Sequence, residues 1–159
     1  MFENNKKNFI KRILKDKVAL LALFSLCVMY FLIAFADFFA VYPSTFANRK
    51  LAYCPPSNVY ILDKNNHLKK PYTYNYIKTF NKESLTIEYK QDRSKKYKLK
   101  FFAKGYEYKI FNLIKWNRHL IVPEDGSYLF ILGSDINGHD VYSRLFFGGQ
   151  ISLTIGFLA

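Results

Sequence analysis

One polar stretch near the end of the chain gathers the residue types most able to do chemistry. Residues 132–145 read LGSDINGHDVYSRL, which places a histidine between two aspartates and an arginine four residues after the second. A histidine beside a carboxylate can act as an acid–base pair, because imidazole titrates near neutral pH. A lone histidine in a glycine-rich turn is more often structural, and we favour that interpretation of His139 beside Asp135 and Asp140. The spacing permits an ion pair of Arg144 with Asp140, although the arginine could equally extend to a membrane surface.

No other pattern in the chain points to catalysis or to a bound cofactor. The sequence lacks a phosphate-binding G-x-x-x-x-G-K-[ST] loop, a G-x-S-x-G turn, H-E-x-x-H and C-x-x-C. His67 and His119 are expected in separate turns, with no carboxylate or cysteine at ligand spacing. Cys27 falls inside a hydrophobic block and Cys54 well outside it, so both are expected to be free thiols. We therefore expect no enzyme activity of its own, no catalytic residue, no cofactor and no metal.

The polar stretch also has the features of a capped turn that opens a helix. Gly138 is expected to supply a backbone conformation closed to other residues. Asp135 or Asp140 would cap the helix, where a carboxylate also favours the helix dipole by about 1 kcal/mol. After residue 140 the apolar residues recur every three to four positions, and residues 145–159 are almost wholly apolar. The pattern predicts a signature turn over residues 132–144 and a hydrophobic helix from 145 onward.

A hydrophobic block near the start of the chain predicts a transmembrane helix. Residues 18–36 are nineteen residues without a charged side chain. This length is close to the ~20 residues that cross a bilayer. Residues 1–17 carry six basic and two acidic side chains, a net charge of 6 − 2 = +4. The positive-inside rule then keeps residues 1–17 in the cytoplasm and places the chain that follows the helix outside.

The middle of the chain, residues 37–131, predicts a mostly antiparallel β domain. Residues 59–62 form an apolar run typical of a strand, and apolar and polar residues alternate over 85–89, 97–101 and 106–111. We expect a hairpin that returns from His67, and a further turn at Gly105. Aromatic and lysine residues interleave here, as they do on nucleic-acid surfaces. Period-two alternation explains the same pattern as a half-solvated sheet, so we expect no nucleic-acid partner.

The signature turn and the residues after it resemble a long motif of bacterial ABC importer permeases. The family pattern of the oligopeptide/dipeptide/nickel class, in its C-type subunit, runs roughly L-G-T-D-x-x-G-R-D-x-x-S-R-L-x-x-G-x-R-x-S-L. This chain has Ser134 for the threonine, and His139 and Gln150 for two arginines. Losing an arginine removes a fixed charge and a planar fork that histidine and glutamine do not reproduce. The matching positions that we assign a structural role are Gly133, Asp135, Gly138, His139, Asp140, Ser143, Arg144 and Gly148.

The resemblance implies a subunit of the inner membrane that pairs with a sister permease. Two cytoplasmic ATPase subunits would power transport by binding a coupling loop between later helices, which we expect to be missing here, and an external binding protein would deliver peptide. The fold class expected is an α+β membrane protein: a cytoplasmic basic segment 1–17, transmembrane helix 18–36, external β-rich domain 37–131, signature turn 132–144 and the start of a second transmembrane helix 145–159. That last segment would span roughly 22 Å at 1.5 Å per residue, against a bilayer core of ~30 Å. We therefore expect the N-terminal portion of an otherwise all-α polytopic permease, inactive by itself.

An alternative from a different class is a single-pass envelope protein. Its external β-rich domain would bind a partner or ligand, and the apolar residues 145–159 would lie along the membrane surface. Both interpretations put the protein in the bacterial cytoplasmic membrane, in contact with lipid, with residues 37–144 external.

Overall fold

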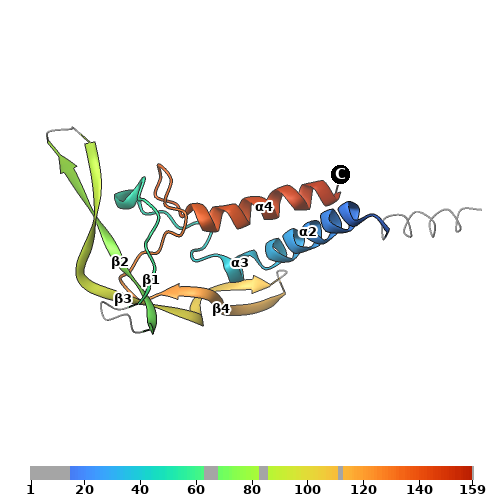
Figure 1. Ribbon diagram of the computed structural model, residues 1–159, viewed down its shortest axis with the longest axis horizontal. Helices are drawn as coiled ribbons and strands as arrows, with labels where there is room; N and C mark the ends of the chain where they lie inside the picture. The colour runs from blue at the N-terminus through green and yellow to red at the C-terminus, as the bar shows by residue number, and fades with distance from the viewer. Residues whose placement is uncertain (1–14, 63–67, 83–85, 111–112, 159) are drawn as a thin grey trace, which may run out of the picture.

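The chain folds as an α+β protein with a four-stranded antiparallel sheet (Figure 1). The computed structural model describes residues 15–62, 68–82, 86–110 and 113–158. This coarse fold class confirms the antiparallel β domain predicted for the middle of the chain. In chain order the elements are α2 (Lys17–Ala34), α3 (Ala36–Phe39), the 3-10 helix η1 (Arg49–Leu51), β1 (Tyr60–Leu62), β2 (Leu68–Asn81), β3 (Thr86–Ile110), β4 (Ile114–Pro123) and α4 (Val141–Leu158).

The predicted apolar helix is present as α2. The side chain of Asp16 caps it by accepting a hydrogen bond from Val18 N at 2.9 Å. It ends at Phe35, whose φ of −106° and ψ of 32° break the helix one residue before α3 begins, so the helix stops two residues short of the predicted position 36. None of its residues is buried, and among the described helices α2 alone is long and apolar enough to cross a membrane.

The second predicted apolar helix is present as α4, which lies beside α2 and runs antiparallel to it (Figure 1). The two helices approach closely at Gly149, where an added Cβ would lie 2.9 Å from Ile33 Cδ1. Nearer the sheet, the rings of Phe39 and Phe146 stack with centroids 5.7 Å apart. By length and composition α4 does not qualify as a membrane span, because it carries Arg144, Gln150 and several small residues.

The strands follow one another in the order β1-β2-β3-β4, and the long strand β3 belongs to two hairpins. Its first half pairs with β2, from Asn81↔Thr86 to Tyr72↔Lys98, and its second half pairs with β4. The predicted return of the chain after residues 59–62 is confirmed by the pairing of β1 with β2, while His67 lies outside the described residues. The two hairpins extend in different directions from the middle of β3 (Figure 1).

Two predictions about turns were wrong. Gly105 lies inside β3 and does not turn the chain, and His119 lies in β4, paired with Ala103 across the sheet. The glycine is required by a close approach: a Cβ at Gly105 would lie 2.6 Å from His119 Cδ2. A glycine within a strand pattern can mark such a contact as well as a turn.

A small core forms where the segment after α2, the segment before α4 and the sheet meet. Leu129 and Phe130 are almost fully buried there, 0% and 1% exposed. One cluster joins Leu129 to Val41 and Leu99, and a second joins Phe130 to Leu51 and Cys54. The core therefore lies at the base of α4, next to the signature turn.

Candidate functional site

The signature turn is a tight loop whose two glycines adopt left-handed backbone conformations. Gly133 has φ +83° and Gly138 has φ +77°, so the special conformation predicted for Gly138 is confirmed. An added Cβ at Gly138 would lie 1.9 Å from the carbonyl oxygen of Asn48, and one at Gly133 would lie 2.9 Å from that of Cys54. Both glycines thus let this turn approach the backbone of the segment around residues 48–54.

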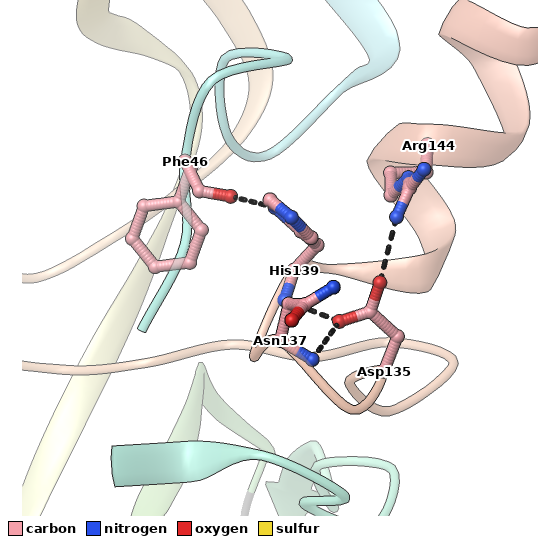
Figure 2. A network of polar contacts seen from close by, with 5 residues as sticks. All are labelled: Phe46, Asp135, Asn137, His139 and Arg144. Atoms are coloured by element: carbon pink, nitrogen blue, oxygen red, sulfur yellow. Dashed lines mark hydrogen bonds and ion pairs between the residues drawn. The ribbon is translucent and has the colours of Figure 1, made fainter. Parts of the chain in front are cut away.

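Asp135 organises the interior of the turn. Its Oδ1 accepts hydrogen bonds from Asn137 N at 2.8 Å and His139 N at 2.9 Å, and its Oδ2 accepts from Arg144 Nη1 at 2.7 Å (Figure 2). Burial by itself would raise the pKa of this carboxyl, but these hydrogen bonds outweigh it and lower the pKa below its ordinary value of 3.8. The predicted ion pair of Arg144 with Asp140 was wrong, because the arginine pairs with Asp135 instead.

His139 holds the turn to a distant segment. Its Nδ1 lies 2.6 Å from the carbonyl oxygen of Phe46, which can only accept, so the proton belongs on Nδ1 (Figure 2). The link between His139 and Asp135 runs through the histidine backbone N–H. The side chains of His139, Asp135 and Asp140 therefore do not form an acid–base pair.

Asp140 caps α4 from a buried position. It is 2% exposed, and its Oδ2 accepts from Ser143 N at 2.9 Å and from Ser143 Oγ at 2.6 Å. Of the two aspartates predicted as possible caps, Asp140 fills this role. Burial raises the pKa of its carboxyl, and the hydrogen bonds from Ser143 only partly offset that effect.

Ser143 connects the start of α4 to the chain just after α3. Its Oγ accepts hydrogen bonds from both Val41 N and Tyr42 N, each at 3.1 Å, while donating to Asp140. Ser143 as a whole residue is 2% exposed, so these hydrogen bonds are shielded from water. One side chain thereby fixes the base of α4 against the end of the helical segment α2–α3, about a hundred residues earlier in the chain.

Backbone hydrogen bonds complete the attachment of the turn. Gly138 O accepts from Asn48 N, and Asp135 O accepts from Tyr53 N, both at 3.0 Å. Ser134 bonds Cys54 twice, through its own N–H to Cys54 O at 3.0 Å and by accepting from Cys54 N at its Oγ at 2.8 Å. The Ser134 hydroxyl also donates to Leu51 O. The hydroxyl of Ser134 thus both accepts and donates a hydrogen bond.

A second buried polar cluster was not predicted from the sequence. His119 is 1% exposed; its Nδ1 lies 2.8 Å from Asp37 O and its Nε2 lies 2.9 Å from Tyr106 O. The Tyr106 hydroxyl also reaches Asp37 O at 3.4 Å. This cluster fastens the β3–β4 hairpin to α3, next to the end of α2. Burial raises the pKa of the Asp37 carboxyl, against the opposing effects of His119 and the Tyr106 hydroxyl.

The structure brings seven of the eight predicted site residues together in the signature turn and the first turn of α4. The exception is Gly148, which lies two turns along α4 with nothing within 4 Å of an added Cβ. The cluster around His119 had one sequence signal, the glycine at position 105 inside an alternating pattern. Over the residues that the structure describes, no group of three or more His, Cys, Asp or Glu side chains could hold a metal ion.

The signature turn forms a corner of the chain, held by hydrogen bonds to the segment 48–54 and to the start of α4. Most of its polar groups hydrogen-bond one another or the backbone, whereas the buried Oδ1 of Asp140 has no hydrogen-bond partner among the described residues. These bonds join the start of α4 to the end of the α2–α3 segment. Comparison of the chain with models of known protein families, with curated proteins and with solved structures found no match.

Proposed function

We propose that this chain is a transmembrane permease subunit of an ABC-type peptide importer. Helix α2 would cross the cytoplasmic membrane with its N-terminus inside, the sheet would lie outside, and α4 would re-enter the membrane. The observation that carries the proposal is the contact of Ser143 Oγ with Val41 N and Tyr42 N, each at 3.1 Å. Ser143 lies within the residues that resemble the permease signature, and its contact with the segment after α3 would set the direction in which α4 leaves the external domain.

The signature turn would act as the fixed external corner between two membrane helices. The hydrogen bonds of Ser143 to Val41 and Tyr42 would hold the start of α4 beside the end of the α2–α3 segment. The sister permease would pack against these helices, two ATPase subunits would bind on the cytoplasmic side, and an external binding protein would deliver peptide. The chain itself would carry no catalytic residue, cofactor or metal.

Co-purification from native membranes tests this proposal. We expect an affinity-tagged chain to resist extraction by alkaline carbonate and to retain a sister permease after gentle detergent solubilisation. A Gly138→Ala variant, which disrupts the corner, should stay in the membrane but lose the sister permease. A Gly148→Ala variant serves as the matched control and should keep it. Recovery of the chain without any permease partner would contradict the proposal.

The single-pass envelope protein is the second candidate, and the composition of α4 favours it. Among the described helices α2 alone qualifies as a membrane span, so α4 could lie along the surface with its apolar side chains in the interface. A cysteine introduced at Thr154 distinguishes the two. A membrane-impermeant thiol reagent would label it from outside in the single-pass protein and fail to label it in the permease.

A further inference from the structure

The β3–β4 hairpin ends beside the point where α2 stops. A cleft of about 370 Å³ separates them, with Ala34 and Asp37 on the helical side and Tyr108 and Lys109 on the hairpin side. Gln150 of α4 also lines the cleft. Figure 1 shows this hairpin extending below α2, away from the hairpin formed by β2 and the first half of β3. The end of the hairpin therefore lies at the level at which α2 would leave the membrane.

The hairpin tip, defined here as residues 108–110 and 113–116, exposes large apolar side chains. Leu113 is 84% exposed, Ile114 60% and Trp116 46%. Directly opposed residues of an antiparallel pair share a face, so Trp116 lies on the face of its partner Tyr108. The same rule puts Ile114 on that face. Nothing in the described core uses these side chains, which leaves them available to a partner.

The charges of the hairpin tip select among possible partners. Lys109 and Lys115 are paired across the two strands, and no described residue of the tip is acidic. Tryptophan and lysine beside aliphatic residues are typical of segments at a membrane interface, where the ring and the ammonium reach the headgroup level. The cores of protein–protein interfaces, in contrast, are depleted in lysine. The surface therefore fits anionic phospholipid better than another protein.

We propose that the hairpin tip is an interfacial membrane anchor, with Trp116, Leu113 and Ile114 entering the external leaflet and Lys109 and Lys115 facing phosphate groups. The inference rests on the proposed insertion of α2, which places the tip at the lipid surface. It adds to α2 and α4 a further attachment of the external sheet to the bilayer.

Trp116 is the one tryptophan of the chain, which makes the test direct. The full chain is reconstituted in vesicles of phosphatidylcholine and phosphatidylglycerol, and its fluorescence is quenched either by lipids brominated near the start of the acyl chain or by aqueous iodide. We expect several-fold stronger quenching by the brominated lipid than by iodide. A Leu113→Ser, Ile114→Ser double variant should reverse that preference. An Ile61→Ser variant, equally exposed in β1 but distant from the tip, is the control and should leave it unchanged.

Carbonate extraction of the same vesicles separates this inference from the proposed function. Strong iodide quenching in a chain that resists carbonate would overturn the interfacial anchor and leave the membrane insertion of α2 intact. A chain that carbonate releases would overturn both. Brominated-lipid quenching in a carbonate-resistant chain supports both. Its weakening in vesicles of phosphatidylcholine alone would support the contact with anionic headgroups, and unchanged quenching there would overturn that contact.

Discussion

The guanidinium of Arg144 lies 2.7 Å from Asp135 Oδ2, so the first turn of α4 is tied back to the loop that precedes it. This pair crosses nine residues, where local helix spacing would have selected Asp140 as the partner. Asp140 is withdrawn into the protein to cap α4, which leaves Asp135 as the carboxylate that the arginine can reach. The two aspartates therefore have separate roles, one inside the turn and one at the helix start.

Replacing Asp135 tests the first of these roles. Asp135→Ala removes acceptors from two backbone N–H groups and from Arg144, and should lower the free energy of unfolding by about 1–3 kcal/mol. Asp135→Asn keeps one acceptor and loses the partly exposed ion pair, which contributes only about 0.5 kcal/mol. Chemical denaturation in detergent measures both. An equal loss in the two variants would show that the turn does not depend on the Oδ1 contacts.

The lowered pKa of Asp135 predicts a pH dependence of stability. A carboxyl whose folded-state pKa lies below its unfolded value stabilises the fold above the unfolded pKa, about 3.9. That contribution is lost as the pH falls from there through the folded-state pKa. We expect thermal unfolding measured across this acidic range to show a steeper loss of stability in the natural chain than in Asp135→Asn. Parallel curves for the two proteins would contradict the assignment.

Removing the Ser143 hydroxyl should break the link between α4 and the segment after α3. Ser143→Ala leaves Val41 N, Tyr42 N and Asp140 Oδ2 without this partner in a buried place, at a cost of about 1–3 kcal/mol. Ser143→Thr retains the hydroxyl and is the control, with a smaller expected loss. Hydrogen exchange at Val41 and Tyr42 reports the bond directly: unchanged exchange in Ser143→Ala would rule out the contact.

The two glycines Gly138 and Gly148 offer a matched pair for the backbone of the turn. Gly138→Ala forces a Cβ into the Asn48 carbonyl in a left-handed conformation, and we expect a loss of about 3–5 kcal/mol. Gly148→Ala fills open space on a helix and should be neutral or stabilising by up to about 1 kcal/mol. Thermal melting in detergent compares them. Similar melting temperatures for the two variants would contradict the geometry of the turn.

The contact between Gly105 and His119 predicts a coupled pair of substitutions. Gly105→Ala places a methyl group 2.6 Å from His119 Cδ2 and should destabilise the β3–β4 hairpin. His119→Ala should also destabilise it, by removing the links to Asp37 and Tyr106. Once the imidazole is gone the methyl group fits, so the double variant should lose at least about 0.5 kcal/mol less than the sum of the two single losses. Additive losses would show that the two sites are independent.

Local patterns in the sequence predicted the two long helices α2 and α4, the β1–β2 hairpin and, as one of two candidate aspartates, the cap of α4. An uncharged run, period-two alternation and an aspartate before an apolar period each depend on neighbours a few residues away. Gly138 was recognised for the same reason, since glycine in a polar turn is a local signal. Arg144 shows the limit of local reasoning. The helix spacing permitted an ion pair with Asp140, whereas in the structure the arginine pairs with Asp135.

The contacts that assemble the site join residues far apart in the sequence. Composition and local patterns do not predict such contacts. Ser143 reaches Val41 and His119 reaches Asp37 only after the sheet has folded back against the helical segment. A glycine at position 105 is compatible with either a turn or a close approach of another side chain. The residue that requires the close approach, His119, lies in another strand. Prediction from one sequence therefore located the elements and left open what each of them contacts.

Labelling from the two sides of the membrane tests the central claim most directly. In a chain whose native cysteines are replaced by alanine, Lys15→Cys lies just before α2 and Ser94→Cys lies exposed in β3. We expect a membrane-impermeant thiol reagent applied to spheroplasts to label Ser94→Cys at once and Lys15→Cys only after the membrane is permeabilised. Labelling of both positions in intact spheroplasts, or of Lys15→Cys alone, would contradict an α2 that spans the membrane with the sheet outside.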